Sequence, residues 1–240
     1  MRRTFAAVLV AIGLILLVVL PAVWQLTRPD PVLGDVAAVE SALRATVTTT
    51  PSADEPGRSP SSDPVPPGDA PDDVPLPEAD RLPDGPPVGL RIERIAVDAP
   101  VAPYGVDARS GDMAVPSNVT EVAWYEFGPR PGEGGSAVLA AHVDLASQGP
   151  GVFFDLSELE PGDRVVVAYG GGDEVAFRVT ARVVYDKSEV PLDVIFSPTG
   201  PPVLTLITCG GGFNRQAQSY DSNVVVYAVP DDGSASGVND

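Results

Sequence analysis

The chain from about residue 87 to residue 230 is a succession of short, valine-rich runs that Gly, Pro and Asp interrupt. Each run is long enough for one β-strand, and little of the segment has the length or the periodicity of a helix. The runs span residues 90–97, 123–127, 136–142, 164–169, 174–185, 203–208 and 223–229. Many short strands with little helix indicate an antiparallel barrel or a sandwich, and the pattern leaves both open.

Turn sequences separate several of these runs. Residues 161–163 read Pro-Gly-Asp, and residues 170–173 read Gly-Gly-Gly-Asp, which can close a hairpin. The segment 151–159 is the one candidate for a short helix. We therefore expect residues 87–230 to form one domain, because about 140 residues suffice for a hydrophobic core.

The N-terminal segment from Phe5 to Trp24 carries no charge and consists mainly of Ala, Val, Leu and Ile. At about 1.5 Å per residue, a helix of this length can cross the roughly 30 Å hydrocarbon core of a bilayer. Arg2 and Arg3 precede it, so the positive-inside bias predicts a single-pass anchor within residues 1–28, with the following domain outside the cytoplasm. A cleaved signal peptide is the alternative, although the sequence after Pro21 offers no good cleavage site.

Residues 29–86 are rich in Pro, Asp, Ser, Thr and Ala. Such a segment buries too little apolar area to offset the entropy of ordering it, so we expect a disordered linker. Within it, the amphipathic stretch 36–47 predicts a turn or two of helix near the membrane. We also expect a disordered tail at residues 231–240.

Charge and composition exclude several functions. The chain has 33 acidic residues against 15 Lys and Arg, a net charge of -18, which argues against nucleic acid as a partner and otherwise serves solubility. Its one cysteine and one histidine cannot supply the four ligands of a structural zinc site. The Gly-rich stretch 210–212 lacks the Lys-Ser/Thr of a phosphate-binding loop. We therefore expect neither a metal nor a cofactor.

The only cysteine, Cys209, follows the apolar run 203–208, and the only histidine, His142, follows the apolar run 137–141. Taken singly, each is more often a structural residue than a catalytic one. Both are predicted at strand ends, however, where a barrel displays functional side chains. A thiol needs a neighbouring base to become a useful nucleophile, and His142 is the one histidine that can serve. The pair predicts acyl transfer through a thioester.

These motifs resemble those of a known family. Residues 205–209, Thr-Leu-Ile-Thr-Cys, resemble the segment around the catalytic cysteine of sortases, and residues 140–144, Ala-Ala-His-Val-Asp, resemble the segment around their histidine. With 149–154, 161–163, 208–211 and 220–226 in the same order, the chain is most similar to class F sortases of high-GC Gram-positive bacteria. The resemblance covers nearly all of residues 87–229.

The resemblance implies a closed eight-stranded, mostly antiparallel β-barrel, with short helices and one N-terminal transmembrane helix. It also implies an extracytoplasmic cysteine transpeptidase that cleaves an LPXTG-like sorting signal between Thr and Gly. Cys209 would carry the thioacyl group, and His142 would be the general acid and base. The partners would be secreted proteins with a sorting signal and an amine acceptor from a peptidoglycan precursor.

The third residue that the resemblance implies is an arginine about a dozen residues after the cysteine. Here the only later arginine is Arg215, six residues on, whereas Asp221 and Asn223 occupy the expected stretch. Either Arg215 swings over the site on its loop, or backbone N–H groups or Asn223 bind the oxyanion instead. This departure favours the alternative function, a weak or inactive barrel that binds peptides or cell-wall components.

Overall fold

The computed structural model describes residues 32–45, 82–216 and 219–231. The expected anchor at 5–24, most of the expected linker (46–81) and the expected tail from 232 lie outside the described residues. No helix of the described ranges is long and apolar enough to cross a membrane. The elements are β1 (Val32–Gly34), α2 (Val36–Ala45), β2 (Pro87–Ile92), η3 (Glu93–Ile95), β3 (Val97–Tyr104), β4 (Val122–Tyr125), β5 (Gly135–Ala140), β6 (Asp144–Leu145), β7 (Gly149–Pro150), η4 (Leu156–Glu158), β8 (Arg164–Tyr169), β9 (Glu174–Asp186), α3 (Leu192–Ile195), β10 (Pro202–Asn214) and β11 (Ser219–Pro230).

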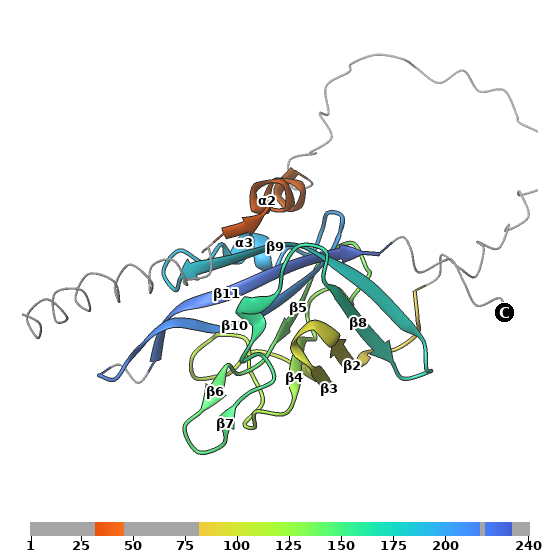
Figure 1. The fold of residues 1–240 in the computed structure, drawn as a ribbon. Helices are drawn as coiled ribbons and strands as arrows, with labels where there is room; N and C mark the ends of the chain where they lie inside the picture. Colours follow the sequence, from red (N-terminus) through yellow and green to blue (C-terminus); the bar gives the residue numbers. More distant parts are fainter. Residues whose placement is uncertain (1–31, 46–81, 217–218, 232–240) are drawn as a thin grey trace, which may run out of the picture. The chain divides into compact units, whose positions relative to one another are not determined.

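Eight strands close into a barrel (Figure 1). Around the ring the order is β9-β11-β10-β5-β4-β3-β2-β8, and β8 pairs with β9 to close it. The pairs β10–β5 and β3–β4 are parallel, whereas the other pairs of the ring are antiparallel. The barrel is therefore mixed, and the closed form, not the sandwich, is the one that this sequence adopts.

The strand predictions agree with most of the ring, and the differences are local. The run 90–97 is not one strand: β2 ends at Ile92, a 3-10 turn follows, and Ala96 takes a left-handed conformation (φ 53°) that turns the chain into β3. The helix expected at 151–159 is reduced to the 3-10 turn η4. The hairpin predicted at 170–173 does join β8 to β9.

Alternation along the strands sorts the apolar side chains into two groups. The interior core fills the barrel and includes Leu90, Leu139, Leu206, Phe177 and Val226. The outer cluster lies on the other face of β5, β9, β10 and β11, beneath α2 and α3; its buried members are Leu43, Val138, Ala181, Val183, Val194, Ile195, Val203, Val225 and Tyr227. The barrel therefore buries apolar side chains on both faces of these four strands.

Residues 32–45 fold onto the barrel, although they belong to the segment expected to be a disordered linker. β1 pairs with the edge of β9, and the amphipathic stretch predicted at 36–47 forms α2. Asp35 caps α2 by accepting a hydrogen bond from the N–H of Ala38 (2.9 Å). The physical reason is Leu43, which is only 1% exposed within the outer cluster: tertiary burial orders a helix too short to be stable alone.

Candidate active site

His142 and Cys209 lie on the outer face, at one end of the parallel pair β5–β10. In this pair Ala140 is the register partner of Ile207. The N–H of Ala141 donates to the carbonyl of Ile207 (3.3 Å), so the pairing continues past the end of β5. Because side chains alternate, His142 and Cys209, each two residues farther on, share the face of Ala140 and Ile207. The structure thus brings the two predicted residues to adjacent strand positions.

A second contact fixes the two segments against each other. The Thr208 hydroxyl, buried in the barrel, donates to the carbonyl of Ala141 (2.8 Å). This bond joins the residue before the cysteine to the residue before the histidine. From the sequence, the Thr208 hydroxyl either orients the neighbouring cysteine or belongs to a threonine that simply favours a strand. In the structure the hydroxyl makes a cross-strand contact with the segment that carries His142.

The ring of His142 is held by the loop before β4. Its Nε2 lies 2.8 Å from the carbonyl oxygen of Pro116. A carbonyl can only accept, so Nε2 carries a proton, and in the neutral ring Nδ1 keeps the free lone pair. The main chain of His142 lies very close to that of Gly151. A Cβ added to Gly151 would stand 2.2 Å from the His142 carbonyl oxygen, so only glycine fits there. The ring of His142 is therefore held by Pro116, and its backbone packs against Gly151.

The position of Cys209 differs from the sequence prediction. β10 does not end at the cysteine but continues to Asn214, paired with β11, with a bulge between Gly210 and Phe213. Asp221 stabilises the bulge by accepting a hydrogen bond from the N–H of Gly212 (2.8 Å). The thiol is partly buried. Cys209 thus sits on a paired strand, which fixes its backbone more firmly than a flexible loop would.

A tyrosine that the sequence analysis missed lies near the pair. Burial, a hydrogen bond to Asp144 and the proximity of Cys209 raise the pKa of Tyr220 above its ordinary value. Its ring packs edge-on against Phe213, with centroids 5.1 Å apart. Asp144 therefore contacts the strand that follows Cys209 in sequence, whereas its position two residues after His142 suggests a bond to the imidazole or a loop cap. No local sequence pattern reveals this contact.

The backbone of Arg215 is six residues along the chain from Cys209 and past the end of β10. Arg215 is exposed and lies one residue beyond β10, at the end of the β10–β11 hairpin. At about 3.3 Å per strand residue, that end is about 15 Å from Cys209 after allowing for the bulge. Asn223, in contrast, is the direct register partner of Cys209 on β11. Opposite residues of an antiparallel pair share a face, so the Asn223 amide is on the thiol's side of the sheet.

Comparison with known proteins assigns this architecture. The family model described as the sortase domain matches residues 90–231, which is more than half of the chain. The chain belongs to the sortase family. This family is one of cysteine transpeptidases. Sortases are generally associated with the cell surface. No curated protein sequence matches the chain.

Solved structures of other sortases are also similar. Sortase C1 of Streptococcus agalactiae is 24% identical, with a TM-score of 0.46, over 60% of this chain and 66% of that one. Sortase A of Corynebacterium diphtheriae is 19% identical, with a TM-score of 0.46, over 67% of this chain and 66% of that one. The Clostridium perfringens sortase D5 transpeptidase is 18% identical, with a TM-score of 0.45, over 61% of this chain and 79% of that one. The chain thus spans just under two thirds of the first two proteins.

Among the described residues, no group of three or more His, Cys, Asp or Glu is arranged to hold a metal ion. The described side chains of the site offer one thiol, one imidazole, and amide and hydroxyl groups around them. A thiol beside an imidazole of fixed tautomer is suited to nucleophilic attack on a carbonyl carbon.

Proposed function

We propose that the chain is a membrane-anchored, extracytoplasmic sortase that cleaves an LPXTG-like signal between Thr and Gly and transfers the acyl part to a cell-wall amine. The observation that carries the proposal is the adjacency of His142 and Cys209 at the end of the β5–β10 pair. Class F is the subfamily that the sequence motifs favour. Residues 5–24 serve as the anchor in this proposal.

In the first half-reaction, the Cys209 thiol gives its proton to Nδ1 of His142, and the sulfur attacks the threonine carbonyl carbon. The C–N bond to glycine then breaks, and His142 passes the proton to the departing glycine amine. The products are a thioacyl enzyme and the released C-terminal peptide. The hydrogen bond from Nε2 to Pro116 supports this role, because it leaves Nδ1 to accept and return the proton.

In the second half-reaction, the acceptor amine attacks the thioester carbon and the C–S bond breaks. The proton lost by the amine returns through His142 to the Cys209 sulfur, so the enzyme is regenerated. Water in place of the amine would give hydrolysis. The same imidazole acts as base in one direction and as acid in the other.

The oxyanion formed in both steps needs a hydrogen-bond donor. We assign this role to the Asn223 amide, since Asn223 pairs directly with Cys209 across β10 and β11. Arg215 is the other candidate, and it would require the β10–β11 hairpin to bend toward the thiol. A long guanidinium suits an oxyanion in charge and shape, which keeps Arg215 as a candidate. Mutation of each residue separates the two assignments.

The test uses the full chain in detergent micelles with a fluorogenic LPXTG peptide and triglycine as the amine. We expect cleavage, a triglycine adduct, and an acyl group on Cys209 that mass spectrometry detects. The binding-only alternative predicts that the peptide associates without cleavage. Absence of both cleavage and acyl-enzyme, with variant sorting peptides included, would reject the enzyme.

A further inference from the structure

The row of outer-face side chains that begins at His142 and Cys209 continues across two more strands. Cys209 is the partner of Asn223 in β10–β11, and Asn223 is the partner of Tyr185 in β11–β9. Directly opposite side chains share a face, so the four residues form one row across β5, β10, β11 and β9. With strands about 4.8 Å apart, Tyr185 lies about 10 Å from Cys209. The row is short enough for one extended peptide to cover.

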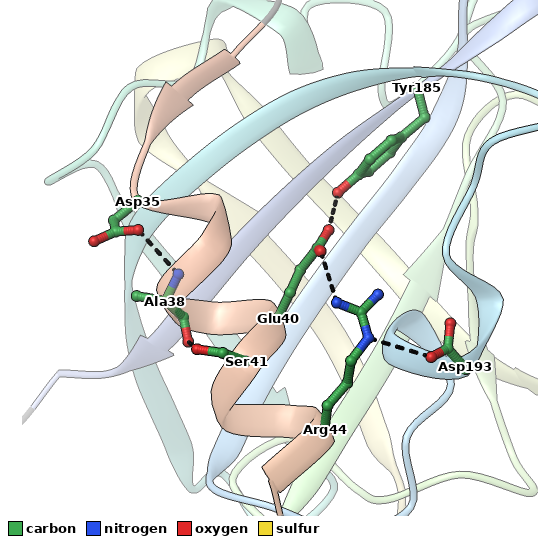
Figure 2. A network of polar contacts seen from close by, with 7 residues as sticks. All are labelled: Asp35, Ala38, Glu40, Ser41, Arg44, Tyr185 and Asp193. Carbon is green, nitrogen blue, oxygen red and sulfur yellow. Dashed lines mark hydrogen bonds and ion pairs between the residues drawn. The ribbon is translucent and has the colours of Figure 1, made fainter.

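The far end of this row is held by α2. Figure 2 shows the Tyr185 hydroxyl donating to a carboxylate oxygen of Glu40, whose other oxygen pairs with Nη1 of Arg44 (3.1 Å). Nε of the same arginine lies 3.3 Å from Asp193 in α3. Burial, and then the hydrogen bond to Glu40, raise the pKa of Tyr185, which keeps the hydroxyl protonated as a donor. The orientation of Tyr185 therefore depends on α2.

Residues 32–45, here named the N-terminal clamp, are fixed to the barrel at two other points. Gly34 (φ 81°) lets β1 lie close to β9: an added Cβ would stand 2.1 Å from the Thr180 carbonyl oxygen. Leu43 packs in the outer cluster against Gly200, where an added Cβ would be 3.3 Å from the Leu43 Cα. These contacts position Glu40 independently of its bond to Tyr185.

The clamp lies outside the family domain, which matches residues 90–231. Tyr185, in contrast, lies inside that domain and in the row of Cys209. A segment outside the matched domain thus places a carboxylate on a residue in the row of Cys209. The burial of Leu43 is enough to hold the clamp on the barrel. The Glu40–Tyr185 hydrogen bond additionally connects the clamp to the row of Cys209.

We infer that the N-terminal clamp is part of the peptide-binding site: through Glu40 it fixes Tyr185, and Tyr185 sets the far end of the surface on which the acyl-donor peptide binds. This inference rests on the proposed function. Glu40 and Tyr185 are positioning residues, since neither reaches the reacting carbonyl. Loss of the contact should weaken peptide binding and leave the chemical step at Cys209 unchanged.

Three variants of the full chain test the inference. Glu40→Ala and Tyr185→Phe each remove the hydrogen bond, and Gly34→Ala displaces β1 without altering either partner. We expect KM for the LPXTG peptide to rise about fivefold in each, the size of one hydrogen bond, with kcat within twofold of wild type. The double variant Glu40→Ala/Tyr185→Phe should show no further rise, because the two residues act through one contact.

Matched controls remove similar groups elsewhere. Tyr169→Phe deletes a buried phenol that donates to the Pro131 carbonyl (2.6 Å), at the end of the β8–β9 pair that lies opposite to Tyr185. Gly172→Ala places a side chain at a positive φ (91°) in open space on the β8–β9 hairpin. Both should lower stability without changing KM. Hydrogen exchange of the α2 amides should rise in Gly34→Ala and Glu40→Ala and stay at the wild-type rate in the controls.

A binding readout separates this inference from the proposed function. Iodoacetamide alkylates the Cys209 thiol, and bound LPXTG peptide should protect the thiol from alkylation. We expect protection in the wild type to be about five times better than in the clamp variants, whether or not the peptide is cleaved. Equal protection in wild type and in variants with a released α2 would overturn the clamp inference alone. No protection of the wild-type thiol by any sorting peptide would overturn the proposed function and the inference with it.

Discussion

His142 is bound through Nε2 to the carbonyl oxygen of Pro116 at 2.8 Å, which leaves Nδ1 as the unprotonated nitrogen of the neutral imidazole. The loop before β4 thereby selects the tautomer, and the β5–β10 register selects the neighbour. Both Pro116 and β5 are distant in sequence from the cysteine. The candidate site is consequently a product of the barrel, because three separate segments must close around it.

Removal of either member of the pair should stop acyl transfer. We expect Cys209→Ala to leave no thioacyl enzyme and no measurable kcat, and His142→Ala to lower kcat/KM by at least about a thousandfold. The double variant should be no worse than Cys209→Ala, because the two residues act as a unit. Turnover of the fluorogenic peptide measures all three, and a His142→Ala enzyme with near wild-type rates would remove the histidine from the mechanism.

The oxyanion donor should be revealed by comparing two truncations. If Asn223 donates, Asn223→Ala lowers kcat by about a hundredfold, whereas Arg215→Ala retains wild-type kcat. The reverse pattern would assign the role to Arg215 and to a bent hairpin. The measurement is kcat at saturating peptide, since an oxyanion contact forms in the transition state and not with the bound substrate.

The contact between Thr208 and Ala141 should matter for both stability and rate. Thr208→Val keeps the shape but removes the 2.8 Å hydrogen bond, so we expect a loss of about 1–2 kcal/mol in the free energy of unfolding and a fall in kcat. Thr205→Val is the control, because Thr205 bonds only to Ser136 (2.8 Å), farther from the pair. Urea unfolding should give similar losses for both, with kcat reduced only in Thr208→Val.

Alkaline pH should destabilise the fold through its buried phenols. Burial raises the pKa of Tyr169 to about 12 and that of Tyr227 to about 12. The folded-state values lie above the unfolded value of about 10, so the stability that the neutral phenols contribute is present below pH 10 and declines as pH rises through 12. Urea titrations from pH 8 to pH 12 should show this decline, and a smaller one in Tyr169→Phe.

At neutral pH, removal of the hydroxyl should change the free energy of unfolding differently at Tyr169 and at Tyr227. Tyr169 donates to Pro131, so Tyr169→Phe costs about 1–2 kcal/mol. The Tyr227 hydroxyl faces Tyr185 but makes no hydrogen bond of good geometry within the described ranges. Tyr227→Phe should therefore leave the free energy of unfolding unchanged or raise it by up to about 1 kcal/mol.

The strand pattern and the candidate reactive residues are readable in the chain without the structure. Alternating valine-rich runs specify strands because apolar side chains on one face must be buried, and residues 164–169 and 174–185 are found where the pattern predicts them. The single thiol and single imidazole make Cys209 and His142 the candidate nucleophile and base. The alternation alone left both a barrel and a sandwich open. The resemblance of the motifs to those of sortases favoured the closed barrel.

How these parts meet depends on long-range contacts. Ring closure, the two parallel pairs, the extension of β10 past Cys209 and the order of residues 32–45 all depend on contacts between segments distant in sequence, which no local pattern encodes. The same holds for the partners of His142 and Tyr185: Pro116 and Glu40 are ordinary residues in the chain. They become parts of the site because the strand register and the burial of Leu43 bring them there.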